Sequence, residues 1–265
     1  MSDLRPIGIF DSGIGGLTVL AALQKRLPGE RFVYLGDTAR LPYGTKSAET
    51  VVRYAIRAAR FLAHADVKLL VIACNTASAA ALPEVESAVP VPVIGVVEPG
   101  ARAALAHAHA RVGVIGTEST IASGAYSRAL VALRPSIEVL LQPCPLFVPL
   151  AEEGWFDHPV TREVARIYLE PIVSAGVDAL ILGCTHYPLL AGAIGAAVGR
   201  RVVLIDSARA VAEEVEQLVK ERDMTGEGGG GARILVTDAA ARIRRIAGYV
   251  LGDAPAALEL VDLPE

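Results

Sequence analysis

Short apolar runs, rich in β-branched residues, alternate along the chain with longer amphipathic stretches. In LTVLAALQKRL (17–27) and SAETVVRYAIRAARFLAHA (47–65) the apolar residues recur at helical spacing. Nearly continuous apolar strands that alternate with helices are typical of a mainly parallel sheet covered on both faces. The pattern therefore predicts an α/β protein. The predicted strands are IGIF (7–10), RFVYLGD (31–37), KLLVIA (68–73), VPVIGVV (91–97), RVGVIGT (111–117), EVLLQP (138–143), DALILG (178–183), VVLID (202–206) and RILVTD (233–238).

Two of these strands end in the same kind of polar cluster. The first is LLVIACNTA (69–77), with Cys74, Asn75 and Thr76, and the second is LILGCTHYP (180–188), with Cys184, Thr185 and His186. A helix-like stretch follows each cluster, and roughly one small domain separates them. The repetition predicts two similar α/β halves, each with a thiol at the carboxyl end of a strand. Ligands of open α/β sheets bind at that edge.

The composition is that of a globular protein. The chain has 265 residues, of which 52% are hydrophobic and 20% charged, and its net charge is −4. This length allows one or two domains with a substantial core. The slight acidic excess, without long charged blocks, argues against a basic surface for nucleic acid. We therefore expect a small-molecule partner and no nucleic acid.

A membrane span and an exported location are both disfavoured. Residues 179–199 contain no Asp, Glu, Lys or Arg and are long enough to span a bilayer. Polar residues lie together in the middle of this stretch, where lipid would leave them without partners. It is better explained as a strand, a functional turn and a helix. The start shows no signal-peptide pattern, and three cysteines cannot pair completely, which favours a reducing cytoplasm.

Two further strand endings allow both a structural and a functional interpretation. FDSGIGGLTVL (10–20) carries Asp11 and Ser12, and it fits either a tight capped turn or an anion site at a helix N-terminus. Its glycines do not match the dinucleotide fingerprint, and it has no phosphate-loop lysine. YLGDTARLPYGTKS (34–47) contains Tyr43 and Gly44, and turn chemistry alone explains its Pro-Tyr-Gly.

The remaining candidates favour structural roles. Cys144 lies between prolines in QPCPLF and has no polar neighbour, as expected of a buried structural thiol. Glu152 and Glu153, in AEEGWF (151–156), resemble a solvated pair in a loop. Zinc is disfavoured, because Cys184 and His186 lack the usual ligand spacing and no second cluster completes the site. GEGGGG (226–231) predicts a surface loop. No site role is assigned to His64, His107 or His109.

Two thiols on opposite sides of one small molecule suit a particular reaction. A thiolate can accept a proton, so one thiol could remove a proton from a carbon while the other returns one to the opposite face. That exchange inverts a stereocentre. The carbanion needs fixed donors, and Ser12, Asn75, Thr76 and Thr185 are suitable. Asp11 could hold an ammonium group or orient Cys74, and His186 could assist Cys184. No pyridoxal motif surrounds any of the four lysines, Lys25, Lys46, Lys68 and Lys220, so we expect no cofactor.

With these residues in view, the chain closely resembles the bacterial glutamate racemases. The matching segments run in order from residue 8 to about 191. They are GIFDSGIGGLTVL, YLGDTARLPYGTKS, VIACNTASAAAL, VIGVVEPG, GVIGTESTI, CPLFVPLAEEG and LILGCTHYPLL. The resemblance implies cofactor-independent interconversion of L- and D-glutamate, which supplies D-glutamate for peptidoglycan. It also implies two similar doubly wound parallel-sheet domains with the active site in the cleft between them.

The resemblance further assigns domains and residue roles. The first domain would comprise residues 1–97 and 208–265, and the second residues 98–207. Cys74 would take the proton from D-glutamate with help from Asp11. Cys184 would take it from L-glutamate with help from Glu152 and His186. The implied substrate site comprises Asp11, Ser12, Tyr43, Gly44, Asn75, Thr76, Thr117, Thr120, Thr185 and His186, with the two threonines of GTEST as the weaker members. Family members are often homodimers, which we also expect here.

Two alternatives remain open at this point. A related racemase or lyase-like enzyme could use the same thiols on another small acid, such as aspartate. A protein of another class could bind such an acid with inert thiols. Some glutamate racemases also inhibit DNA gyrase, but nothing in this acidic sequence supports that second role.

Overall fold

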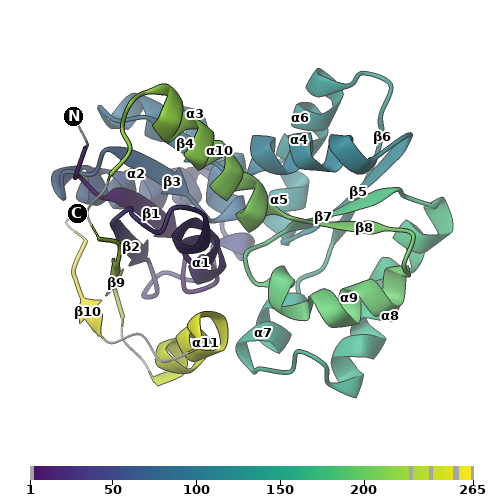
Figure 1. Cartoon of the computed structure of the whole chain (residues 1–265). Coiled ribbons are helices and arrows are strands. Elements are labelled where there is room, and N and C mark those ends of the chain that lie inside the picture. The colour runs from purple at the N-terminus through teal and green to yellow at the C-terminus, as the bar shows by residue number, and fades with distance from the viewer. Residues whose placement is uncertain (1–2, 227–228, 239–240, 253–256, 264–265) are drawn as a thin grey trace.

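Two parallel β-sheets form the frame of the protein, as the computed structural model shows for residues 3–226, 229–238, 241–252 and 257–263 (Figure 1). The first sheet has the order β10-β9-β2-β1-β3-β4 and the second β6-β5-β7-β8. The strands of the first are β1 (Ile7–Asp11), β2 (Phe32–Gly36), β3 (Leu69–Ile72), β4 (Val93–Gly95), β9 (Ala232–Val236) and β10 (Leu258–Leu260). Those of the second are β5 (Arg111–Gly116), β6 (Glu138–Pro143), β7 (Ala179–Gly183) and β8 (Val203–Asp206). The prediction of a parallel α/β fold is confirmed.

The two sheets repeat one local plan. β2-β1-β3-β4 of the first sheet corresponds to β6-β5-β7-β8 of the second. In each sheet the second strand of the half (β2 or β6) lies on one side of the first strand (β1 or β5), and the next two strands lie on its other side. This creates a switch point between β1 and β3, and another between β5 and β7. The prediction of two similar halves is confirmed, although the sequence pattern did not reveal β10.

Helices cover both faces of each sheet, because each sheet has apolar side chains on both faces. In the first half α1, α10 and α11 pack on one face, and α2 and α3 on the other. In the second half α4 and α6 oppose α7, α8 and α9. The helices of the first half are α1 (Leu17–Arg26), η1 (Tyr43–Thr45), α2 (Ala48–His64), α3 (Asn75–Ala88), α10 (Ser207–Glu221) and α11 (Ala241–Leu251). Those of the second are α4 (Val97–His107), α5 (Glu118–Ala122), α6 (Ala125–Leu133), α7 (Phe147–Glu152), α8 (Pro159–Ala175), η2 (Tyr187–Leu190) and α9 (Ala191–Val198).

The chain leaves the first half once and then returns to it. After β4 it builds the second half, and α10 leads it back so that β9 and β10 join the first sheet beside β2 (Figure 1). We propose the division into residues 1–97 with 208–265 and residues 98–207. Its support is that Val96 and Ala208 pack in the core of the first half, whereas Val97 and Ile205 pack in that of the second.

Two unusual stretches of the sequence have ordinary places in the fold. The uncharged residues 179–199 form β7, η2 and α9, and no helix in the described part of the chain has the length and apolarity to cross a membrane. In the stretch 226–231, Gly229 and Gly231 are exposed, as a surface loop requires. The prediction is wrong for Gly226, which is buried because its N–H donates to the buried Glu30. Residues 227–228 lie outside the described part.

Candidate active site

A cavity of about 370 Å³ lies between the two halves, at the carboxyl ends of the central strands. Its volume suits a small metabolite. The first half contributes Ser12, Gly13, Leu41, Pro42, Tyr43, Gly44, Thr45, Cys74, Asn75 and Thr76 to the wall. The second contributes Thr117, Glu118, Pro145, Val148, Pro149, Glu152, Cys184, Thr185 and His186. Most of the predicted site residues therefore line one cavity. Asp11 and Thr120 lie behind its wall.

Cys74 follows β3 and caps the N-terminus of α3. Its sulfur accepts a hydrogen bond from the N–H of Ala77 at 3.5 Å and donates to Ser12 Oγ at 3.3 Å. The side chain is only 5% exposed. Burial, and then the nearby carboxylate of Asp11, raise the pKa of Cys74 to about 12, against the opposing effect of the two hydrogen bonds. These surroundings keep the Cys74 thiol protonated at neutral pH.

Asp11 is the last residue of β1 and lies against Cys74. Its Oδ2 accepts from the N–H of Gly13 at 2.9 Å. Its Oδ1 is buried and has no hydrogen-bond partner within the described part of the chain. Burial raises the pKa of Asp11, while the positive charge of His186 and the N–H groups of Gly16 and Gly13 oppose this rise. An acceptor without a partner at this place can receive a donor from a bound molecule.

Cys184, His186 and Glu152 form a relay on the opposite wall. Cys184 follows β7, and its sulfur lies 3.8 Å from His186 Nδ1. His186 Nε2 lies 3.2 Å from Glu152 Oε1. Burial alone would lower the pKa of His186, but its contacts with Cys184 and with the charged Glu152 raise it to about 10. The imidazolium therefore persists at neutral pH and places a positive charge beside the sulfur of Cys184.

The interpretation of Glu152 and Glu153 as a solvated loop pair is wrong for Glu152. This residue ends α7 and is 7% exposed, because the helix turns it inward toward His186. Only Glu153, the next residue, is exposed. A local charge pattern cannot distinguish the two, since the direction of each side chain depends on how α7 packs in the second half.

Asn75 supplies a free donor in the floor of the cavity. The hydroxyl of Tyr126, from α6, donates to Asn75 Oδ1 at 2.5 Å. This contact fixes the amide, so that its buried Nδ2 has no partner within the described part of the chain. A free buried N–H group is costly unless a ligand accepts from it. Because Asp11 offers a free acceptor nearby, the site presents complements for both a carboxylate and an ammonium group.

Three hydroxyl groups join the two halves beside the cavity. Thr76 of the first half lies 3.0 Å from Thr117 and 3.1 Å from Thr120, which belong to the second. Thr117 and Thr120 are 2.9 Å apart, so the three Oγ1 atoms form a triangle. Thr120 is buried behind the wall, where it orients the two threonines that face the cavity.

The turn 43–45 closes another side of the cavity. The Tyr43 hydroxyl donates to Asp37 Oδ2 at 2.6 Å, which fixes the ring. Gly44 packs against Thr117 so closely that an added Cβ would lie 2.7 Å from the threonine Cβ. Ser119 of the second half donates to the Gly44 carbonyl at 2.8 Å. Turn chemistry explains the sequence here, and the turn also helps to line the site.

Gly15 packs closely against Thr185 and His186 of the opposite wall, so a larger residue there should disturb the site. A methyl group on Gly15 would overlap Thr185 Oγ1 and lie 2.6 Å from His186 Nδ1. We expect Gly15→Ala to displace both groups and lower kcat about 100-fold, the cost of a misplacement near 1 Å. Gly192→Ala is the control, because nothing lies within 4 Å of its added methyl. Equal turnover by the two variants would show that the approach is unimportant.

Several residues of the wall escaped the sequence analysis. Pro145, Val148 and Pro149 are apolar and lie between Cys144 and Glu152. Glu118 lies at an exposed edge and is also a usual first-turn residue of a helix. The only available signal was that these residues belong to the matching segments GVIGTESTI and CPLFVPLAEEG. Tyr126, the partner of Asn75, had no signal at all, since it comes from a distant helix.

The described residues contain no group of three or more His, Cys, Asp or Glu side chains that could hold a metal ion. None of the four lysines lines the cavity. The groups available for chemistry there are thiols, hydroxyls, an amide, an imidazole and carboxylates.

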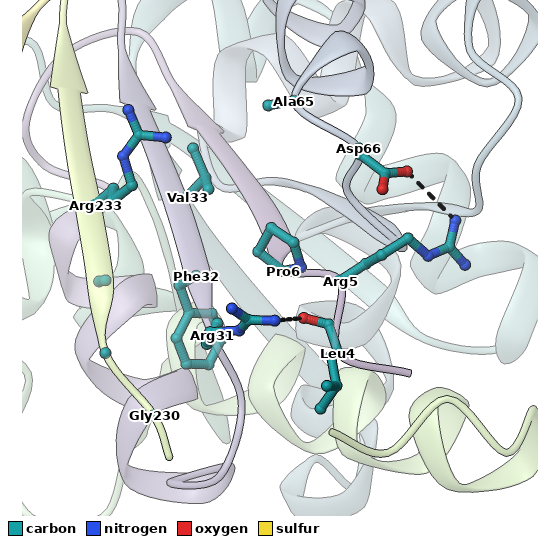
Figure 2. Close-up of a pocket in the computed structure, with 12 residues that line it drawn as sticks. Leu4, Arg5, Pro6, Arg31, Phe32, Val33, Ala65, Asp66, Gly230 and Arg233 are labelled. Atoms are coloured by element: carbon teal, nitrogen blue, oxygen red, sulfur yellow. Dashed lines mark hydrogen bonds and ion pairs between the residues drawn. The ribbon is translucent and has the colours of Figure 1, made fainter. Parts of the chain in front are cut away.

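A larger hollow, of about 630 Å³, lies at the opposite edge of the first sheet (Figure 2). It surrounds the amino ends of β1, β2 and β9, whereas ligands of such sheets bind at the carboxyl ends. Its arginines already have partners within the protein: Arg5 pairs with Asp3 and Asp66, Arg233 pairs with Glu259, and Arg31 donates to the carbonyl of Leu4. We therefore place the active site in the smaller cavity, where both thiols lie.

Comparison with known proteins gives a consistent result. Residues 17–215 match the model of the family described as Asp/Glu/Hydantoin racemase. The chain is 52% identical to a glutamate racemase of Geobacter metallireducens, over 94% of this chain and 93% of that protein. The glutamate racemase of Francisella tularensis, solved in complex with D-glutamate, has a TM-score of 0.93 and 40% identity, with 98% of each chain covered. That of Thermus thermophilus, solved with β-chloro-D-alanine, has a TM-score of 0.90 and 48% identity, with 99% of each covered.

Proposed function

The chain belongs to the Asp/Glu/Hydantoin racemase family, and on this premise we propose that it is a cofactor-independent glutamate racemase. It interconverts L- and D-glutamate and supplies D-glutamate for peptidoglycan synthesis. The observation that carries the proposal is the placement of Cys74 and Cys184, which come from corresponding strands of the two halves and face one cavity.

In the proposed reaction each thiol acts on one face of the α-carbon. With D-glutamate, the Cys74 thiolate takes the α-proton, and the electron pair left on the carbon delocalises into the α-carboxylate. The Cys184 thiol then donates its proton to the opposite face, which gives L-glutamate. The cycle leaves Cys74 as a thiol and Cys184 as a thiolate. This is the state that accepts L-glutamate for the reverse reaction.

The polar wall stabilises the charge that develops on the carboxylate. Asn75 Nδ2 and the Thr76 hydroxyl are donors held in place by Tyr126 and by Thr117 and Thr120, so they need little reorganisation during the reaction. The Thr185 hydroxyl is a further donor in the wall. The carboxylate of Asp11 attracts the substrate ammonium toward the Cys74 side. The positive ammonium offsets the effect of Asp11 on Cys74, so substrate binding itself favours the thiolate there.

Cys74 and Cys184 lie in different electrostatic surroundings. Burial and the carboxylate of Asp11 raise the pKa of Cys74 to about 12, whereas the sulfur of Cys184 lies 3.8 Å from the positively charged ring of His186. One thiol and one thiolate are what a two-base exchange requires.

We also propose a cytoplasmic location and a homodimeric state. All three cysteines are free, which suits a reducing compartment. Homodimers are what the family resemblance implies, and sedimentation of the purified protein tests this directly.

The experiment that tests the proposed function uses purified protein and L-glutamate in D2O, without added cofactor. We expect optical rotation to fall to zero while deuterium enters the α-position, because the product proton comes from a thiol that exchanges with solvent. Folded protein that exchanges aspartate and leaves both glutamate enantiomers unchanged would assign another substrate. Binding of glutamate without any exchange would indicate a binding protein with inert thiols.

A further inference from the structure

Helix α11 belongs to the first half but reaches the segment of the second half that carries Glu152. Ile243, Ile246 and Ala247 on one face of the helix are buried in the core beside α1. Arg245 and Tyr249 are four residues apart and therefore share another face of α11. In Figure 1 that helix lies next to α7.

This second face of α11 contacts the turn that follows Glu152. Arg245 donates to the carbonyl of Glu152 at 3.3 Å and lies 3.7 Å from the Glu153 carboxylate. Tyr249 meets Phe156 edge-on, with ring centroids 5.1 Å apart. Gly154 has a φ of +76°, and a Cβ there would lie 2.7 Å from the Tyr249 hydroxyl. The close fit leaves no room for a side chain on this turn.

The contact of Arg245 has a clear physical effect on α7. The helix has only six residues and ends at Glu152, so its last carbonyls have no partner within the helix. An arginine at a helix C-terminus satisfies such a carbonyl and interacts favourably with the helix dipole. Arg245 thereby fixes the backbone of the residue whose side chain lies 3.2 Å from His186.

We propose that α11 positions the Cys184 relay from across the cleft, with Arg245 as the positioning residue that holds Glu152 against His186. The proposal rests on the proposed racemase function and adds a residue to it. Arg245 touches neither the thiols nor the cavity. It acts through the backbone of Glu152, so the first half of the protein supplies part of the support for the base of the second.

The test compares Arg245→Ala with Arg244→Ala in the full-length protein. Arg244 is the matched control, because it is exposed on the same helix and has no hydrogen bond or ion pair within the described part of the chain. We expect Arg245→Ala to lower kcat on the order of 10-fold, less than the roughly 100-fold cost of a 1 Å displacement, with little change in KM. Arg244→Ala should match the wild type, and Arg245→Lys, which keeps a charged donor, should recover part of the rate.

The pH profile separates positioning from a general structural role. The relay needs the imidazolium of His186, whose pKa of about 10 depends in part on Glu152. A displaced Glu152 raises that pKa less, so the alkaline limb of kcat should move to lower pH in Arg245→Ala only. A variant with the wild-type kcat and pH profile would overturn the proposal. Equal loss of rate in Arg245→Ala and Arg244→Ala would also overturn it.

The fluorescence of Trp155 reports on the turn after Glu152 independently of enzyme activity. It is the single tryptophan of the chain and lies in the turn that α11 holds. Its fluorescence anisotropy should fall in Arg245→Ala and in Tyr249→Ala, and stay unchanged in Arg244→Ala. An unchanged anisotropy in all three variants would contradict the proposed contact. A wild type that does not racemise glutamate would overturn the proposed function instead, and Trp155 would still decide whether α11 holds the turn.

Discussion

Replacement of Cys74 or Cys184 by serine is expected to lower kcat for glutamate racemisation by about 10³-fold or more, within the range that general acid–base groups contribute. A serine hydroxyl is far less acidic than a thiol, so the variant lacks a usable base on one face of the substrate. Because the enantiomers have equal free energies, kcat/KM must fall equally in both directions. Polarimetry with each enantiomer measures the loss.

Cys144→Ser is the matched control for these variants. Cys144 is also buried, in the core of the second half, but it lies outside the cavity and its sulfur donates only to the carbonyl of Gln142. A serine can keep that bond, so turnover should be retained. In D2O, Cys74→Ser should still exchange the α-proton of L-glutamate, which Cys184 reaches, without inverting it. A cysteine variant with near-normal turnover in both directions would exclude the two-base mechanism.

The replacement Lys68→Met is expected to lower the free energy of unfolding by about 3–5 kcal/mol, the cost of breaking a buried ion pair from one side. Lys68 and Glu30 are 1% and 2% exposed, and their charged atoms are 2.6 Å apart. Lys68 Nζ also donates to the carbonyls of Asp3 and Met224. The pair thus joins four segments at the amino edge of the first sheet. Urea unfolding, followed by circular dichroism, measures the change.

Two further variants identify the cause of that loss. Lys220→Met removes an exposed ammonium that pairs with Glu216 within one helix, so its effect should stay below about 1 kcal/mol. Adding Glu30→Gln to Lys68→Met removes the uncompensated charge and keeps an acceptor for the N–H of Gly226, which should restore part of the stability. A Lys68→Met variant as stable as Lys220→Met would show that the pair contributes nothing.

The sequence by itself determined the elements of the fold. Nine apolar runs became strands because a strand buried on both faces needs a nearly continuous apolar run, which few other structures require. The repeated ending after 69–73 and 178–183 also revealed the two halves and drew attention to both thiols. The tenth strand was missed because Leu258–Leu260 is short and lies at the edge of the sheet, where the apolar pattern is weak.

The sequence predicted only part of the site. The endings with Cys74 and Cys184 are informative because thiols, amides and hydroxyls rarely follow a buried strand together. The family resemblance pointed to Glu152, whose local pattern indicated a solvated residue. No pattern indicated Tyr126 or Arg245, whose partners are distant in the sequence.

What only the tertiary structure decided is how the halves meet. Three contacts join segments far apart in the chain. They are the approach of Gly15 to His186, the threonine triangle, and the contact of α11 with the turn after Glu152. The pKa values of Cys74 and His186 also depend on this packing. Burial raises the first, and the contacts with Cys184 and Glu152 raise the second. Local sequence sets periodicity and turns, because these depend on neighbours along the chain. Proton affinity and close approach depend on neighbours in space, and the packing of the two halves supplies them.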